Sequence, residues 1–208
     1  MMQTALMGQK HDRINRDTDV HDAESIRLRR EGKLLLLTRK EVVIRILDTA
    51  IQMWFGSADP ISVHILACVA HKNLNGFAKK MQKPPPTLTQ GMKWEDIYST
   101  YDHVRHNEKG GDPNHRDQFV VDNNQIMLFD CLQTFENLFS LRTPWMNTFG
   151  AYIVLHRRVP GDFGVEAQNP TYEIFPGIRV SEVIDLSAKA FVKKLYPVFL
   201  RAYQSGFY

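Results

Sequence analysis

The chain has 208 residues, 43% of them hydrophobic and 24% charged, a composition typical of a soluble globular protein rather than a disordered or fibrous one. Its longest aliphatic run is the four leucines at 34–37, whereas a membrane-spanning helix needs about 20 apolar residues and a secretion signal at least about 7, so we expect neither. The net charge of +3 comes from residues 1–40, which hold nine Lys or Arg and six Asp or Glu, while residues 41–208 hold seventeen of each.

Two further features bear on location and partners. The only cysteines, Cys68 and Cys131, lie far apart in apolar surroundings, which predicts free thiols and a reducing cytoplasm. One dense basic cluster could bind nucleic acid through its phosphates, although charges near a terminus are also commonly just solvated. This cluster contains Arg27, Arg29, Arg30, Lys33, Arg39 and Lys40.

The sequence predicts an all-α fold, a helical bundle of about five core helices with a C-terminal helical extension. Residues 1–25 are polar and without lasting periodicity, and we expect residues 1–37 to form a flexible basic tail. Residues 38–158 carry the amphipathic patterns of the bundle. Residues 159–208 are expected to form a loop and a C-terminal helix that packs on the bundle.

The first two helices have clear start signals. Thr38 and Glu41 fit a capping box, and apolar residues then recur at helical spacing: Val43, Ile46, Leu47, Ala50, Ile51 and Trp54. Asp59 and Pro60, an N-cap acceptor and a proline suited to the first helical position, predict the second start. Its expected buried stripe is Ile61, Ile65, Cys68 and Val69.

Three more helices complete the predicted bundle. Trp94, Ile97, Tyr98, Tyr101 and Val104 mark the third. Asp122 is expected to cap the fourth, whose stripe is Ile126, Phe129, Leu132, Phe135, Leu138 and Phe139. Thr143 and Pro144 start the fifth, with Trp145, Phe149, Tyr152 and Ile153 facing inward.

The amino-acid composition changes in the C-terminal part of the chain. Glycines and prolines after Pro160 predict a loop, with a short extended piece at 172–175. A last helix is expected over 181–203, kinked at Pro197.

A histidine and cysteine pattern on the second helix raises the question of a metal site. His64, Cys68 and His71 are spaced by four and three residues, so they project from one side of a helix, and His103 or His106 could supply a fourth ligand. No Cys-x-x-Cys or His-Glu-x-x-His pattern supports this arrangement, and Cys68 also lies on the apolar stripe. We therefore predict packing here, with no metal and no other cofactor.

A second group of polar residues lies near the end of the third helix. Asp102 and His103 fall on its flank and outer side and are candidate binding residues, while Arg105 falls back towards the stripe. Arg105 and His106 could hold a phosphate, with His106 as general acid or base. The alternative is that these cations cap the helix C-terminus.

These same residues carry a resemblance to a group of uncharacterised bacterial proteins. The resemblance lies in an Asp-Pro-x-Ser-x-His-x-Leu-Ala motif and a later basic-His turn followed by Asp-Pro, and it spans residues 40–158. The matching residues are Asp59, Pro60, Ser62, His64, Leu66 and Ala67, then Arg105, His106, Asn107, Glu108, Asp112 and Pro113. The turn departs from the pattern at Gly110 and Gly111. This group implies no activity.

The chain is also distantly similar to HEPN domains, helical bundles that include metal-independent ribonucleases of toxin and phage-defence systems. Their catalytic pattern is an Arg, then about four to six residues, then a His. Here Arg105 is followed directly by His106 and, only after nine residues, by His115, so the motif is incomplete. The resemblance would make His64, Arg105 and His106 the catalytic set.

Two functions follow, and whether the chain is an enzyme stays open. The first is a binding or assembly module that self-associates through the apolar face of its C-terminal helix, with structural histidines. The second is a HEPN-like ribonuclease or nucleotide-binding protein. Convergence of His64, Arg105 and His106 in one open pocket would favour the second.

Overall fold

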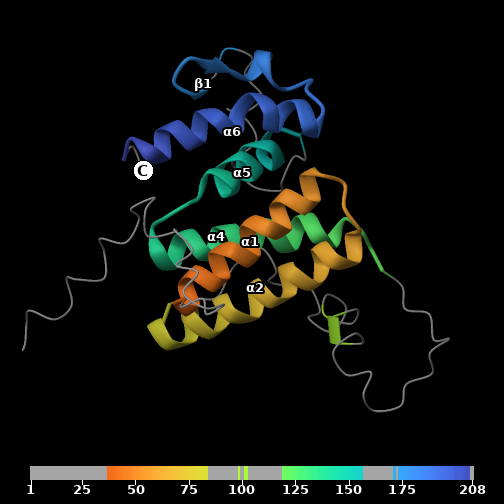
Figure 1. Ribbon diagram of the computed structural model, residues 1–208, viewed down its shortest axis with the longest axis vertical. Coiled ribbons are helices and arrows are strands. Elements are labelled where there is room, and N and C mark those ends of the chain that lie inside the picture. The colour runs from red at the N-terminus through yellow and green to blue at the C-terminus, as the bar shows by residue number, and fades with distance from the viewer. Residues whose placement is uncertain are drawn as a thin grey trace, which may run out of the picture. The chain divides into compact units, whose positions relative to one another are not determined.

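The computed structural model describes residues 37–83, 98, 101–102, 119–156, 171 and 173–206. By backbone contacts the chain divides into two units, Met1–Thr38 and Arg39–Tyr208. The second unit contains five described α-helices: α1 (Arg39–Phe55), α2 (Pro60–Met81), α4 (Asn123–Phe139), α5 (Pro144–His156) and α6 (Ala188–Gln204) (Figure 1). The prediction of an all-α fold is confirmed.

The starts of α2 and α5 follow the predicted capping residues. The Asp59 side chain accepts hydrogen bonds from the Ser62 backbone N–H and hydroxyl, both at 2.7 Å, and Pro60 takes the first helical position. At α5, the Met146 N–H donates to the Thr143 hydroxyl oxygen at 3.2 Å. These bonds satisfy backbone donors that the first turn leaves unpaired, so the local sequence is sufficient to place both starts.

The start of helix α4 differs from the prediction. Asp122 precedes it, but the Asp122 side chain makes no capping hydrogen bond and its backbone is already in the right-handed helical region. Instead, the backbone N–H groups of Asn123 and Asn124 donate to the carbonyls of Val120 and Val121 in a tight turn. The prediction of an Asp122 cap is therefore wrong, because the preceding turn supplies the acceptors.

The C-terminal region also begins its helix later than predicted. A small antiparallel hairpin of β1 (Glu173–Phe175) and β2 (Ile178–Arg179) confirms the expected extended piece, and Gly177 takes the positive φ of 81° in its turn. A 3-10 turn over Val180–Glu182 follows, and α6 starts only after Ser187, whose hydroxyl accepts from the Ala190 N–H. The expected helix over 181–203 is thus too long at its N-terminal end.

Helix α2 packs against both α1 and α4. The short turn after α1 makes α1 and α2 antiparallel neighbours, side by side in Figure 1. Helices α2 and α4 run parallel, because Asn124 bonds to the Pro60 carbonyl near their starts and Lys83 bonds to the Asn137 carbonyl near their ends, at 2.8 and 2.6 Å. The contacts of His64 with Asn124 and of His71 with Asp130, described below, cross this parallel pair.

The buried side of α2 is not the one predicted. Ile61 is 41% exposed and Ile65 and Val69 are only half-buried, whereas Cys68 is buried as expected. The residues that are buried are largely small or polar: Val63, His64, Ala67, Cys68, Ala70, His71, Leu74 and Ala78. Small side chains let α1 and α4 approach α2 closely, so the helix turns its alanines rather than its isoleucines inward.

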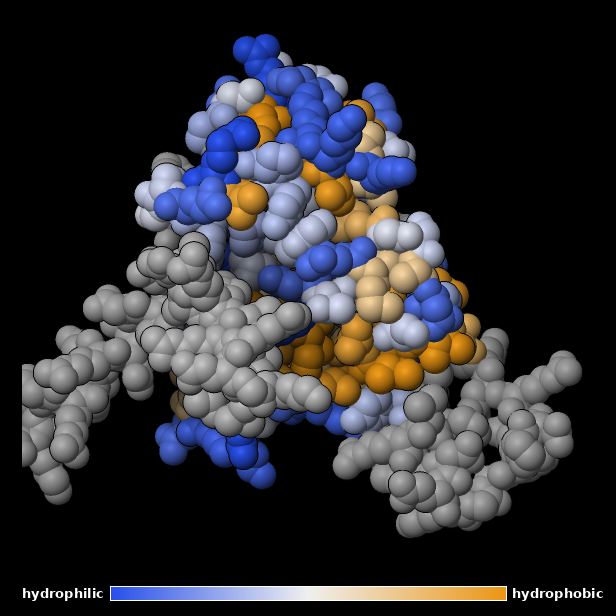
Figure 2. Space-filling model, in the orientation of Figure 1, coloured by the Kyte–Doolittle hydropathy of each residue, from blue (hydrophilic) through white to orange (hydrophobic). Residues whose placement is uncertain are grey.

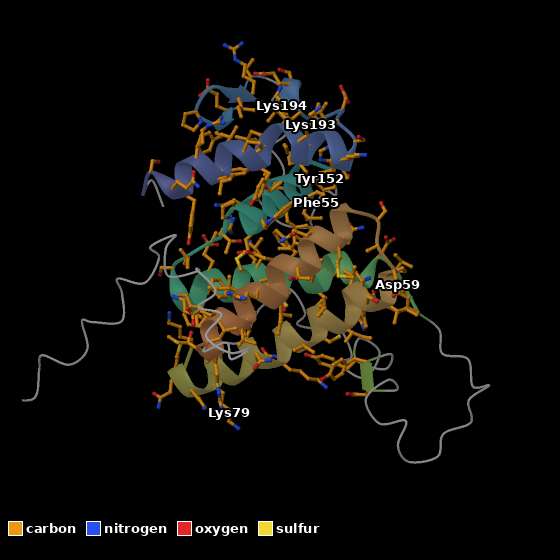
Figure 3. The ribbon with its side chains drawn as sticks, viewed as in Figure 1. Phe55, Asp59, Lys79, Tyr152, Lys193 and Lys194 are labelled. Atoms are coloured by element: carbon orange, nitrogen blue, oxygen red, sulfur yellow. The ribbon has the colours of Figure 1, made fainter. Side chains whose placement is uncertain are left out.

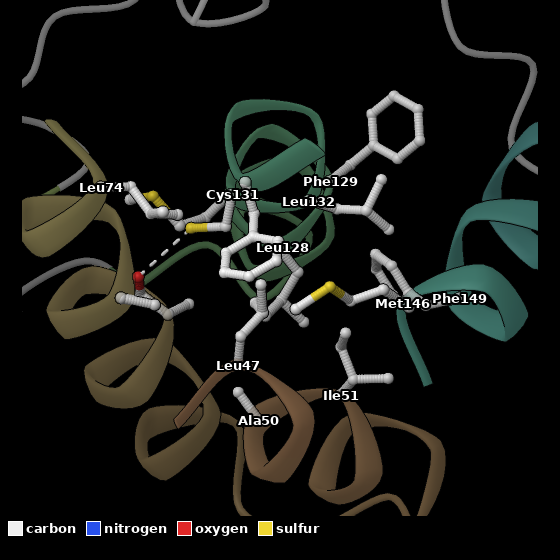
Figure 4. Packing of buried hydrophobic residues seen from close by; sticks show 14 of the residues in the cluster. Leu47, Ala50, Ile51, Leu74, Leu128, Phe129, Cys131, Leu132, Met146 and Phe149 are labelled. Carbon is white, nitrogen blue, oxygen red and sulfur yellow. Dashed lines mark hydrogen bonds between the residues drawn. The ribbon is translucent and has the colours of Figure 1, made fainter. Parts of the chain in front are cut away.

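The main core fills the space between α1, α2, α4 and α5. Figure 4 shows it, with Leu47 and Ile51 of α1 facing Leu128 and Leu132 of α4. The Cys131 thiol in this core donates to the Ala67 carbonyl at 3.6 Å. Helix α5 contributes Met146, Phe149 and Ile153 to this core and Leu155 to a second one.

The second core joins α5 to the C-terminal elements. Its buried members are Leu155, Val180, Val183, Phe191, Leu195 and Phe199. The apolar face of α6 is thus used inside the molecule, while Lys193 and Lys194 are exposed (Figure 3). No described helix is long and apolar enough to cross a membrane.

Candidate functional site

The parallel pair α2 and α4 encloses two histidines that the sequence singled out. His64 and His71 are 1% and 0% exposed, and two polar residues of α4 lie opposite them, Asn124 at 1% and Asp130 at 0%. Burying such groups is costly unless they are hydrogen-bonded, so their partners determine what the site can do.

His64 bonds through both ring nitrogens. The Asn124 amide nitrogen donates to the Pro60 carbonyl, so the Asn124 oxygen is turned towards His64 and accepts from Nδ1 at 2.9 Å. Nε2 lies 3.4 Å from the sulfur of the Cys68 thiol. Burial raises the pKa of that thiol to about 12, which keeps it protonated and unreactive. His64 therefore links the first turns of α2 and α4.

His71 joins Asp130 to Tyr98. Its Nε2 lies 2.8 Å from Asp130 Oδ2, and its Nδ1 lies 2.5 Å from the Tyr98 hydroxyl and 3.1 Å from the Asn75 amide nitrogen. The Asp130 carboxylate oxygen can only accept, so Nε2 is the donor in that contact. Within the described chain, the second Asp130 oxygen, Oδ1, is buried and accepts no hydrogen bond.

Tyr98 ends this chain of hydrogen bonds near the surface. Burial is the main cause that raises its pKa, with smaller contributions from neighbouring Cys68, Cys131, Asp130 and Asp102. The hydroxyl is therefore a phenol that donates a hydrogen bond, rather than a phenolate nucleophile, at neutral pH. The hydrogen-bonded chain Tyr98–His71–Asp130 therefore contains no activated nucleophile.

Asp102 lies outside the buried network. Its carboxylate accepts from Lys72 Nζ at 2.9 Å, with the two side chains 47% and 33% exposed. The same ammonium lies 4.5 Å from the ring centre of Tyr98 and 4.1 Å from that of Tyr101. The Asp102 carboxylate thus keeps the Lys72 ammonium over two aromatic rings, and the ion pair links Asp102 to α2.

The structure places only part of the predicted set. His64 lies in the core against Asn124 and Cys68, and Asp102 lies at the surface with Lys72. His103, Arg105 and His106 lie outside the described residues, so their convergence with His64 stays a prediction. His64 and His71 share one face of α2, but each contacts a different residue of α4.

Metal binding by α2 gains no support from the part of the chain that the structure describes. No group of three or more His, Cys, Asp or Glu side chains there is arranged to hold an ion. His64 and Cys68 bond to each other, and His71 bonds to Asp130. The candidates His103 and His106 are not among the described residues.

The sequence interpretation missed Asp130 and Asn124. Asp130 lies between Phe129 and Cys131, within an otherwise apolar helical pattern, and it is fully buried. A lone carboxylate in such a pattern signals that a buried donor lies opposite, because an unpaired charge would be too costly. Asn124 carries a weaker signal, since an Asn at a helix start commonly serves as a cap.

Comparison with known proteins identifies no relative. No family model, curated protein or solved structure matches this chain. The resemblances noted in the sequence therefore remain predictions.

Proposed function

We propose that this chain is a binding or assembly module, and that its partner is a second copy of itself. The proposal depends on one apolar surface, which we call the α2–α4 patch. Its members are Ile61, Val120, Val121 and Ile126, which are 41%, 49%, 54% and 40% exposed. They account for four of the six exposed large hydrophobic side chains of the described residues.

The patch lies where the start of α2 adjoins the start of α4. The Asn124 bond to the Pro60 carbonyl holds the first turns of α2 and α4 together, so residues 60–61 and 120–126 are neighbours. Figure 2 shows apolar surface over α1 and α2, whereas the surface over α6 is mainly hydrophilic. Exposed apolar groups that cluster in this way are typical of protein interaction sites.

The buried histidines support binding rather than catalysis. His64 and His71 are enclosed by α2 and α4, where their ring nitrogens contact Asn124, Cys68, Asp130 and Tyr98. The C-terminal helix does not offer the self-association face expected from the sequence, because Phe191, Leu195 and Phe199 pack in the second core. The α2–α4 patch takes its place in the proposal.

Sedimentation velocity over a range of concentrations tests this function. The wild-type chain is expected to form a dimer that Ile61→Asp/Val121→Asp disrupts, because both charges would be buried in the interface. Val42→Asp is the matched control, since Val42 is similarly exposed, at 37%, at the start of α1. Dimerisation that survives the double substitution, or a wild-type monomer at every concentration, would contradict the proposal.

The alternative function is a HEPN-like metal-independent ribonuclease. It needs Arg105 and His106, and it is tested by RNA cleavage with chelator-treated wild type and His106→Ala. If this alternative holds, cleavage is expected only from the wild type, with unchanged melting temperature in the variant. Cleavage by neither protein would leave the binding module as the function to pursue.

A cytoplasmic location is part of the same proposal. Cys68 and Cys131 are both free and buried. Reduced thiols are the usual state of cysteines in that compartment.

A further inference from the structure

The exposed face of α6 is basic. The helix contains no Asp or Glu, and its four cations, Lys189, Lys193, Lys194 and Arg201, are all exposed. At about 100° per residue they lie within an arc of about 140°, opposite the buried side of the helix. Lys193 and Lys194 lie on the side of α6 away from α5 (Figure 3). Residues 41–208 hold seventeen cations and seventeen acids, so this face is a local excess of positive charge.

Three of these cations have no acidic partner in the part of the chain that the structure describes. Lys194 Nζ bonds to the Glu182 carboxylate at 2.9 Å and to the Glu182 carbonyl at 3.2 Å. The described ion pairs and cation–π contacts include none of Lys189, Lys193 and Arg201. A cation is favourable in the last turn of a helix, where Arg201 lies, but unfavourable in the first turn, where Lys189 lies. Helix stability therefore does not account for the row as a whole.

The chemistry of this face selects its partner. A helix that lies on a membrane inserts an apolar face among the lipids, and the apolar face of α6 is buried in the second core. Proteins that bind single-stranded nucleic acid stack its bases on exposed aromatic rings. The aromatic residues of α6 are buried or half-buried, and the Tyr196 ring already stacks on Trp145, with ring centres 4.2 Å apart. Cations without apolar or aromatic company suit the phosphates of a duplex.

We propose that the exposed face of α6 binds the phosphate backbone of double-stranded DNA without reading its sequence. Duplex DNA carries one negative charge per about 1.7 Å of its axis, so a row of cations meets several phosphates wherever it lands. Lys189 and Arg201 are about 18 Å apart along the helix, with Lys193 between them. The face shares no residue with the α2–α4 patch. It adds a second activity to the proposed self-association, and either can fail without the other.

Fluorescence anisotropy of a labelled DNA duplex, titrated with the 208-residue chain at several NaCl concentrations, tests the proposal. Three phosphate contacts predict a slope of about −2.7 for log K against log salt, which is about a 40-fold loss of affinity between about 50 and about 200 mM NaCl. Lys189→Gln/Lys193→Gln/Arg201→Gln should weaken binding by at least about tenfold at the lower salt and flatten the slope. Glutamine suits exposed helical positions, so the variant should keep its circular dichroism spectrum.

Arg39→Gln/Lys79→Gln/Lys80→Gln is the matched control, because it removes the same charge from exposed positions outside α6. This variant should keep the wild-type affinity and salt slope. Absence of DNA binding by the wild type at about 50 mM NaCl, or equal losses in the two triple variants, would overturn the proposal. Binding to vesicles that contain phosphatidylserine in place of DNA would also overturn it and assign the face to a lipid surface.

Discussion

Replacing His71 with leucine is expected to lower the free energy of unfolding by about 3–5 kcal/mol, because it leaves the buried Asp130 carboxylate without its partner. Asp130→Leu should be similarly destabilising, since it removes the acceptor for His71 Nε2. The double variant His71→Leu/Asp130→Leu should lose less than the sum of the single losses, because neither the His71 ring nor the Asp130 carboxylate is left without its partner. Urea denaturation followed by circular dichroism measures all three.

Lys79→Leu serves as a control for this set, because Lys79 lies on the same helix and is exposed. Its unfolding free energy should stay within about 0.5 kcal/mol of the wild-type value. Additive losses in the double variant would show that His71 and Asp130 stabilise the fold independently, contrary to the contact across α2 and α4.

Phe149→Ala is the second change with a large expected effect, a loss of about 3–5 kcal/mol in the free energy of unfolding. Phe149 is fully buried, and its ring makes edge-on contacts with Trp54 and Phe55 at centre distances of 5.2 and 6.1 Å. Figure 3 shows Phe55 close to Tyr152, where α1 faces α5. Removing the ring would leave a cavity between these two helices.

Phe149→Leu is the matched control, because it fills most of the same space and should cost clearly less than the alanine change. Urea denaturation of both variants gives the comparison. Equal losses for the two would contradict this expectation, because they would mean that the filled volume contributes little and that the loss comes from the ring contacts themselves.

Local signals predicted much of the fold. Asp59 and Thr143 accept backbone bonds within three residues of themselves, and such short-range chemistry is visible in a sequence. The start of α6 was missed because Val183 is buried in the second core without being part of a helix. An apolar residue that recurs at helical spacing does not by itself reveal which element carries it into a core.

The polar network could be predicted only in part. His64 and Cys68 are one helical turn apart, and their contact follows from the spacing. The partners of His64 and His71 on α4 lie about sixty positions away, and they depend on α2 and α4 running parallel in one register. The apolar pattern of α2 or of α4 alone indicates neither the relative direction of the two helices nor the register in which they pack.

The two-sided packing of α5 restricts where the chain can be shortened. Tyr152 and Val154 pack against both cores, and Leu155 belongs to the second. A fragment that ends directly after α5 would keep the first core but present these side chains to water. Such a fragment would be prone to aggregate, so the segment up to residue 204 is needed for solubility even if recognition resides entirely on α2 and α4.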